Sequence, residues 1–201
     1  MRAPRERERE HAVVTSAGLL LYRNGAAADG REARPASDGP VTSDDGRDGT
    51  ALDVFIAHMG GPFWRSRPRA WSIPKGELET LPDGSEEDAF VAATREFAEE
   101  IGVPAPDVSY RELGTFRQSS GKRVVVFAAA SALEVERVRS ATFALELPRG
   151  SGRFVDFPEV DDARWVPLHD ARALVVAGQV AALDALVALL ADDAARADRE
   201  P

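Results

Sequence analysis

The sequence predicts an α/β fold, an α/β/α sandwich in which a mixed sheet lies between two helices far apart in the chain. Several short apolar runs have the length of strands and are bounded by turn residues. One helical segment, residues 86–101, combines an acidic face with an apolar stripe. A second, residues 171–195, is apolar on much of its surface. Helices that each bury one face against a sheet give three layers.

The first two strands are expected at residues 13–22 and 52–58, where apolar residues run together. Between them, residues 24–50 consist mainly of Gly, Ala, Asp, Pro, Arg and Ser. Such a composition buries too little apolar surface to offset the entropy lost on ordering. We therefore predict a hairpin that carries a disordered insertion.

The acidic helix has clear predicted ends. Ser85 is expected as its N-cap, with Asp88 three residues later, and Gly102 suits the left-handed position that follows a helix. Phe90, Phe97 and Ile101 form its apolar stripe and should dock on the sheet. The expected later elements are strands at residues 110–116, 123–130 and 163–168, turns at 118–122 and within 145–157, and one long helix at 171–195.

Length and composition indicate a single domain at residues 12–195, with flexible ends at residues 1–11 and 196–201. Hydrophobic residues make up 44% of the chain, enough for a core, and the net charge of −9 disfavours binding to duplex nucleic acid. The absence of cysteine excludes disulfides, thiolate metal sites and cysteine nucleophiles. No apolar run reaches the roughly 18 residues of a membrane span. We therefore expect a cytoplasmic protein whose oligomeric state stays open.

Three carboxylates gather on one side of the acidic helix. At 100° per residue, Glu96, Glu99 and Glu100 fall within an arc of about 100°. Their mutual repulsion costs a few tenths of a kcal/mol per pair, and Arg95 offsets only part of it. A hard divalent cation such as Mg²⁺ prefers carboxylate oxygens and would relieve the rest. The alternative for a lone Glu-Glu pair is a solvated acidic face.

Residues 95–103, Arg-Glu-Phe-Ala-Glu-Glu-Ile-Gly-Val, resemble the second half of the Nudix box of the Nudix hydrolases. Seven residues (88–94) lie between Glu87 and Arg95, as the family pattern asks. The Pro-Lys-Gly turn that opens the box is also present, at residues 74–76, but lies too far upstream. The simplest alignment inserts five residues (80–84) as an extra turn. Across about 150 residues the chain is similar to a bacterial Nudix subgroup, which implies the same α/β/α sandwich.

The resemblance implies a hydrolase that cleaves phosphoanhydride bonds in nucleoside diphosphate-linked compounds with the help of Mg²⁺ or Mn²⁺. Carried over by position, the metal ligands are Glu96, Glu99 and Glu100, with Glu100 the most direct, and the Gly76 carbonyl completes the set. Arg95 is expected to orient carboxylates rather than touch substrate. Glu87 occupies the position of a supporting carboxylate.

The residues outside the box are less specific. The general base varies within the family, and Glu159, in Phe-Pro-Glu-Val-Asp before the last strand, is our candidate. Three cationic residues could contact phosphates, although each could equally be a solvated charge: Lys75, Arg117 and Lys122. Trp64 or Phe63 could stack on a base, but packing in the core is the preferred interpretation.

The expected partner is a phosphorylated small molecule, most simply a nucleotide. Trp71, just before the Pro-Lys-Gly turn, resembles the dinucleoside polyphosphate branch of the family. Nucleoside triphosphates, nucleotide sugars and capped RNA ends stay open. The competing hypothesis is a catalytically silent Nudix-fold module, but such modules usually lose box carboxylates, and this chain keeps them all. A structural Ca²⁺ site would need an Asp-x-Asp-x-Asp-Gly loop, which the sequence lacks.

Overall fold

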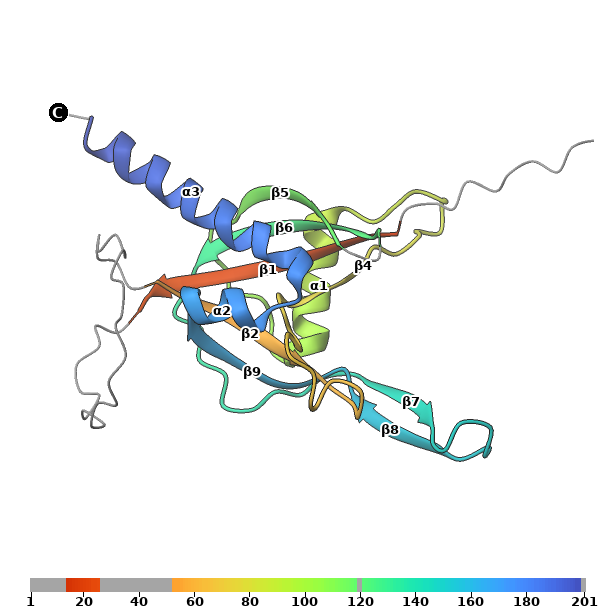
Figure 1. Ribbon diagram of the computed structural model, residues 1–201. Helices are drawn as coiled ribbons and strands as arrows, with labels where there is room; N and C mark the ends of the chain where they lie inside the picture. Colours follow the sequence, from red (N-terminus) through yellow and green to blue (C-terminus); the bar gives the residue numbers. More distant parts are fainter. Residues whose placement is uncertain (1–13, 26–51, 119–120, 200–201) are drawn as a thin grey trace, which may run out of the picture.

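A seven-stranded mixed sheet forms the centre of the computed structural model, which describes residues 14–25, 52–118 and 121–199 (Figure 1). The order is β3-β2-β1-β6-β5, with β4 paired to β1 and β9 paired to β2. Only β1 and β6 run parallel among these pairs. The strands are β1 (Thr15–Asn24), β2 (Leu52–Met59), β3 (Trp71–Ser72), β4 (Lys75–Glu77), β5 (Arg111–Arg117), β6 (Arg123–Ala130) and β9 (Val160–Pro167).

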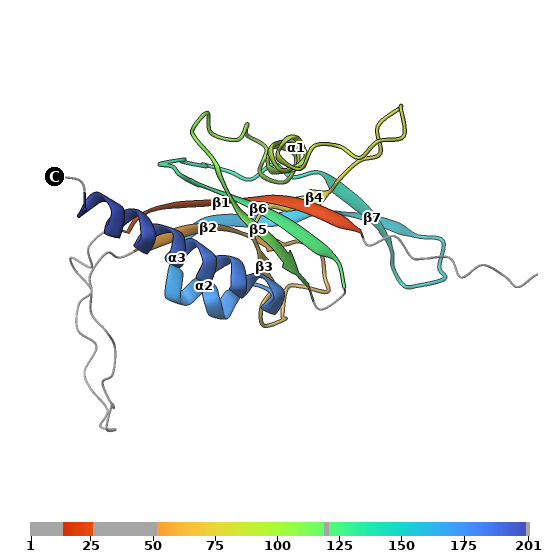
Figure 2. The same cartoon turned by 90° about the horizontal axis from the view of Figure 1, so that it is seen from above.

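Helices cover both faces of this sheet, which confirms the predicted α/β/α sandwich (Figure 2). Helix α1 (Ala89–Ile101) lies on one face, and α2 (Leu168–Leu174) and α3 (Val180–Ala197) lie on the other. Alternate residues of β1 supply the two cores, because successive side chains of a strand point to opposite faces. Leu19 and Leu21 pack with α1, whereas Leu20 packs on the α2–α3 side.

The predicted hairpin of the first two strands is confirmed by antiparallel pairing that runs from Tyr22↔Val54 to Asn24↔Leu52. Strand β1 continues to Asn24, two residues beyond the predicted end. The predicted insertion falls almost entirely on residues outside the described part of the chain, as does the N-terminal segment 1–11. At the other end of the chain, α3 ends at Ala197.

The predicted N-cap of α1 is wrong. Asp88, not Ser85, caps the helix, and its carboxylate accepts hydrogen bonds from the N–H groups of Phe90 and Val91. Ser85 instead bonds Asp83 inside a small turn that is closed by the bridge between Thr80 and Glu86. The cap prediction failed because the extra turn uses Ser85 for its own closure. The predicted end is confirmed, with Gly102 in the left-handed conformation at φ 85°.

The single long C-terminal helix is also wrong. The chain forms α2, then the one-turn 3₁₀ segment η1 (Ala177–Gln179), then α3. Val175 is extended at the break, pairs with Trp71 and so joins the edge of the sheet. Arg69 donates to the carbonyl of Val175, and Gln179 accepts the N–H of Ile73 at 2.7 Å. Hydrogen bonds from β3 and its neighbours, distant in the sequence, therefore divide a segment whose apolar periodicity predicts one continuous helix.

A two-stranded hairpin, β7 (Thr142–Glu146) and β8 (Phe154–Pro158), projects from the body of the molecule (Figure 1). The predicted turn in this region is confirmed at residues 147–153, where Leu147 N–H donates to the Arg153 carbonyl. The strands on either side were not predicted. No helix in the described residues is long and apolar enough to cross a membrane.

Candidate functional site

Glycine at position 76 brings strand β4 against the acidic face of α1. A Cβ atom at Gly76 would lie 1.9 Å from Oε2 of Glu96, so any other residue there would displace this carboxylate. Gly76 pairs with Ala17 of β1, whose side chain belongs to the core under α1. The strand and the helix therefore meet at a carboxylate instead of at an apolar contact.

Glu100 lies deepest among the acids of this face. Its Oε2 accepts the backbone N–H of Lys75 at 2.9 Å. Burial, assisted by the negative charges of Glu96 and Glu159 and opposed by Lys75, raises the pKa of Glu100 to about 7. A carboxylate that resists ionisation in this way gains from any cation placed beside it.

Glu96 and Glu99 extend the acidic face towards solvent. Their side chains are 15% and 50% exposed. The pKa of Glu96 is raised, chiefly by burial and partly by the charges of Glu99 and Glu159, against a hydrogen bond from Arg95 that lowers it. Glu159 follows β8 far along the chain, yet its charge acts on both Glu96 and Glu100. The fold thus brings the candidate base towards the box carboxylates.

Arg95 connects these acids through its guanidinium group. Its Nε and Nη2 donate to the two carboxylate oxygens of Glu87 at 3.1 and 2.9 Å. Nη1 donates to Glu96 at 2.8 Å and to Glu99 at 3.4 Å, and Nη2 also reaches the carbonyl of Glu77 at 3.1 Å. Such a planar fork holds several carboxylates in one arrangement.

The five-residue insertion leaves Glu87 in place. Residues 80–86 form a closed turn, after which Glu87 N–H donates to the Glu79 carbonyl at 2.9 Å. The Glu87 carboxylate is 8% exposed and accepts the N–H of Glu79 at 3.1 Å. The hydrogen bonds from Arg95 lower the pKa of Glu87, so this buried acid stays ionised. The longer loop therefore bulges outward and returns Glu87 to Arg95.

A cavity of about 340 Å³ lies on the other side of β4. Because side chains alternate along a strand, Lys75 and Glu77 point away from α1 and into this cavity. Lys122 also lines it and forms an ion pair with Glu77 at 2.6 Å. Arg117 is exposed at the end of β5 and does not line it. Two of the three predicted phosphate contacts are thus brought together.

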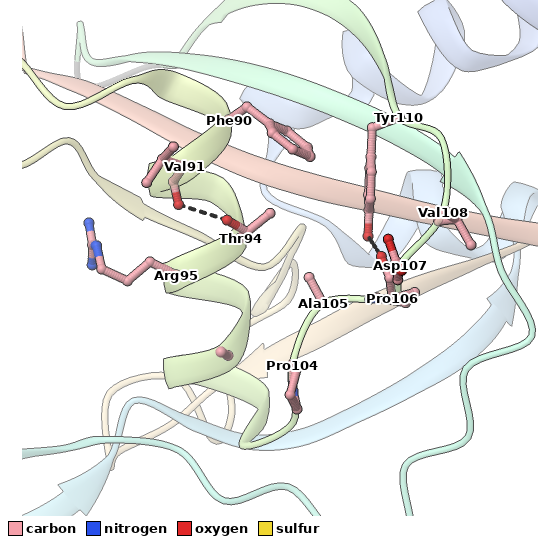
Figure 3. A pocket seen from close by; sticks show the side chains of 11 residues that line it. Phe90, Val91, Thr94, Arg95, Pro104, Ala105, Pro106, Asp107, Val108 and Tyr110 are labelled. Carbon is pink, nitrogen blue, oxygen red and sulfur yellow. Dashed lines mark hydrogen bonds between the residues drawn. The ribbon is translucent and has the colours of Figure 1, made fainter.

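A second cavity, of about 510 Å³, lies on the outer side of α1, between this helix and residues 104–110 (Figure 3). It is lined mainly by apolar side chains, and Figure 3 shows the guanidinium of Arg95 pointing away from it. None of the box carboxylates lines this cavity. It is therefore separate from the candidate site.

Within residues 14–25, 52–118 and 121–199, no three acidic or histidine side chains converge into a ready-made cation site. The box carboxylates are held by protein donors instead, Glu100 by Lys75 N–H and Glu96 by Arg95. The donor set nevertheless fits a hard divalent ion, since it consists of carboxylate oxygens beside the Gly76 backbone. The pKa values of Glu96 and Glu100 are raised chiefly by burial and further by neighbouring carboxylates, and a cation beside these acids would favour their ionised forms.

Several residues of this region were not predicted from the sequence. Glu77 is the most informative, since it accepts from Arg95 and pairs with Lys122, and its place next to Gly76 was a usable signal. Gln118 lines the cavity, and its buried Nε2 has no hydrogen-bond partner among the described residues. The preference for core packing of the loop aromatics is wrong for Phe63, which is 60% exposed, while Trp64 lines the cavity.

Comparison with known proteins agrees with this geometry. A family model described as NUDIX domain matches residues 34–186. One similar solved structure is an Ap4A hydrolase from C. elegans in a binary complex, with 19% sequence identity and a TM-score of 0.51 over 90% of this chain and 99% of that chain. A second is the NUDIX domain of Shewanella oneidensis NrtR complexed with ADP ribose, with 16% identity and a TM-score of 0.52 over 89% of each chain. A third is a mutT/nudix family protein from Listeria innocua, with 14% identity and a TM-score of 0.53 over 90% of this chain and 95% of that chain. At these identities the likeness concerns the fold. No curated protein matches the sequence.

Proposed function

The chain belongs to the Nudix family, and from this premise we propose that it is a divalent-metal-dependent hydrolase of phosphoanhydride bonds in nucleoside diphosphate-linked compounds. The observation that carries the proposal is the arrangement around Arg95, which contacts Glu87, Glu96 and Glu99 at once. A module that only binds a partner has no need to hold several acids beside one another at an electrostatic cost.

The proposed metal ligands are Glu96, Glu99 and Glu100, together with the carbonyl of Gly76. A bound Mg²⁺ or Mn²⁺ would screen the diphosphate, polarise a phosphoryl oxygen and lower the pKa of a water molecule. Support comes from the close approach of Gly76 to Glu96 and from the burial and neighbouring carboxylates that raise the pKa of Glu96. Arg95 and Glu87 would then keep the ligands in place, because groups behind the ligands fix their orientation.

Glu159 is the proposed general base. A carboxylate can accept the proton of the attacking water when it lies within hydrogen-bond reach of it, directly or through one further water. Glu159 is exposed, so water has access to it, and its charge acts on Glu96 and Glu100. This effect of its charge on two proposed metal ligands is the support for Glu159 as the base.

The cavity on the far side of β4 is the proposed binding site for the rest of the substrate. Lys75 and Lys122 would contact phosphate oxygens, and Lys122 would exchange its ion pair with Glu77 for the substrate. Arg117 is left out, because it does not line the cavity. A volume of about 340 Å³ lies at the lower end of ordinary ligand pockets. It suits one nucleotide half of a larger molecule.

Dinucleoside polyphosphates are the first substrates to test, followed by ADP-ribose. Ap4A and ADP ribose are named for two of the structures that share the fold, and both contain a nucleoside diphosphate group. The panel should also contain nucleoside triphosphates, a nucleotide sugar and a capped RNA end. Each compound is incubated with the purified protein and Mg²⁺, Mn²⁺ or EDTA, and the masses of the products identify the broken bond.

We expect hydrolysis of at least one compound with a metal ion, none with EDTA, and at most a trace with Glu100→Gln. Loss of one metal ligand removes several kcal/mol of transition-state stabilisation, and each 1.36 kcal/mol is tenfold in rate. If the wild-type protein binds a nucleotide but cleaves none of the panel with either metal, the silent-module hypothesis replaces this proposal.

A further inference from the structure

Glu159 occupies a junction that would leave it poorly fixed without additional contacts. It is the single residue between β8, in the projecting hairpin, and β9, in the central sheet. Its side chain is exposed, so packing does not hold it. Any rotation of the hairpin about this junction would move Glu159 relative to α1.

A chain of backbone hydrogen bonds crosses this junction. The Glu99 carbonyl on α1 accepts the N–H of Ala141 at 3.1 Å, and the Ala141 carbonyl accepts the N–H of Glu159 at 2.8 Å. The Glu159 carbonyl in turn accepts the N–H of Gly60 at 2.8 Å. Glu159 is therefore linked on one side to the acidic helix and on the other to the end of β2.

Gly60 makes this second link possible. A Cβ atom at position 60 would lie 2.0 Å from the carbonyl oxygen of Pro158 and 3.3 Å from the carbonyl carbon of Glu159. Both are backbone atoms, which cannot rotate away. The φ angle of Gly60 is not in the left-handed region, so the close approach alone demands glycine. Such tight backbone contact is a known use of glycine.

A β-bulge lies immediately beyond Glu159. The pairing of β2 with β9 steps from His58↔Asp162 to Met59↔Val160, which leaves Asp161 without a partner residue. The carboxylate of Asp161 binds Nδ1 of His58 at 2.5 Å. Bulges of this kind redirect neighbouring side chains and are frequent beside functional sites.

We propose that Gly60 and the His58–Asp161 bulge are positioning elements that hold Glu159 towards the carboxylates of α1. This inference rests on the proposed function, in which Glu159 is the general base. The junction is built so that one end of β2 fixes the residue that links the two sheets. Neither Gly60 nor Asp161 needs to touch the substrate for this role.

The test is Gly60→Ala, alone and combined with Glu159→Gln, assayed with Mg²⁺ on Ap4A or ADP-ribose, whichever the wild-type protein hydrolyses faster. The added Cβ, 2.0 Å from the Pro158 carbonyl oxygen, must move by about 1.4 Å to reach an ordinary contact distance, and a misplacement of about 1 Å can already cost on the order of 10²-fold in rate. We expect kcat to fall by about that factor, with KM and the Mg²⁺-induced rise in Tm unchanged. In the Glu159→Gln background, Gly60→Ala should lower kcat by less than about threefold, because coupled residues are not additive.

Two further variants keep the test decisive. Asp156→Ala, on β8 of the same hairpin, is the matched control for Asp161→Ala, since the Asp156 side chain is exposed and lies away from the junction, and kcat should stay at the wild-type level. Asp161→Ala loosens the bulge without any clash, and its smaller loss of kcat should also vanish in the Glu159→Gln background. It decides the question if Gly60→Ala does not fold.

Wild-type kcat in both Gly60→Ala and Asp161→Ala would overturn the inference. So would equal losses with and without Glu159→Gln, a loss confined to KM, or full activity of Glu159→Gln itself. In each of these cases the proposed function still stands if the wild-type protein is active with Mg²⁺ and the Glu100→Gln variant is inactive. A wild-type protein that cleaves nothing removes the proposed function and this inference together.

Discussion

Replacing Glu100 by glutamine should stabilise the metal-free protein although it removes the proposed main metal ligand. The carboxylate of Glu100 is buried on α1 with the Lys75 N–H as its one direct hydrogen-bond donor among the described residues. Glutamine has nearly the same shape, and its amide oxygen can accept the same bond. The substitution therefore removes a buried charge and little else.

The size of the effect follows from the pKa. Burial raises the pKa of Glu100 from 4.5 to about 7, so ionisation in the folded protein is less favourable by 7 − 4.5 = 2.5 pKa units. At 1.36 kcal/mol per unit this is about 3 kcal/mol, an upper bound because the folded protein can relax around the charge. For a chain of this length the gain corresponds to a rise in Tm of roughly 6–12 °C.

The sign depends on pH in a defined way. Below about pH 4.5 Glu100 is protonated in both the folded and the unfolded wild-type protein, so the wild-type protein and Glu100→Gln should be equally stable. Between pH 4.5 and about 7 the unfolded wild-type chain ionises first, so its folded state loses stability as the pH rises. Above that range the advantage of Glu100→Gln should be constant.

The assay is urea unfolding in EDTA at pH 5 and pH 8, with Glu99→Gln as the matched control. Glu99 lies next to Glu100 but is 50% exposed, so its replacement should change the free energy of unfolding by less than about 0.5 kcal/mol. If Glu100→Gln is no more stable than wild type at pH 8, burial of this charge does not carry the cost assigned to it.

Addition of Mg²⁺ should reverse the order. At a concentration of about 1,000 times the Kd, a ligand of the folded state alone adds about 4.1 kcal/mol to wild-type stability, which exceeds the advantage of about 3 kcal/mol that Glu100→Gln has without metal. Glu100→Gln should gain much less, because one direct oxygen ligand has lost its charge. Equal shifts of Tm in the two proteins would count against the metal site.

Three other changes test the remaining structural arguments. Arg95→Lys keeps the charge but loses the planar fork, and a Mg²⁺ titration should show affinity weakened by roughly 10–100-fold; unchanged affinity would remove Arg95 from its organising role. Gln179→Leu leaves the buried N–H of Ile73, between β3 and β4, without an acceptor, and urea unfolding should show that the free energy of unfolding falls by about 1–3 kcal/mol. No loss would mean that water or another group accepts this hydrogen bond. Replacement of residues 25–51 by an Asn-Gly turn should retain activity and change Tm by only a few degrees, because Asn24 and Leu52 are already paired. Loss of activity would assign this segment a part in the site.

The parts of the molecule that were predictable depend on local spacing. The acidic face, the apolar positions Phe97 and Ile101, and the terminating Gly102 are all set within one helix, and the structure contains each of them. Strand residues 123–130 were equally clear, since a run of β-branched residues needs little context. The three-layer fold follows from the order of such elements.

The parts that were not predictable depend on contacts distant in sequence. The break between α2 and α3 exists because Val175 and Gln179 bond to β3 and the chain after it. The position of Glu159 near α1 was inferred from family resemblance, since only the folded sheet joins the two segments. Gly60 gave no signal at all, because its role lies in a contact with Pro158 almost a hundred residues later.

The network around Arg95 also indicates where a cation has most to gain. Arg95 contacts Glu87, Glu96 and Glu99 but makes no hydrogen bond to Glu100. Within the described part of the chain, Glu100 is thus the box carboxylate whose pKa burial raises to about 7 and that has no guanidinium partner. The hydrogen bonds from Arg95 lower the pKa of Glu87, whereas burial raises the pKa of Glu100. Binding of Mg²⁺ should therefore release protons mainly from Glu100 near neutral pH, and the Glu100→Gln protein should release almost none in the same titration.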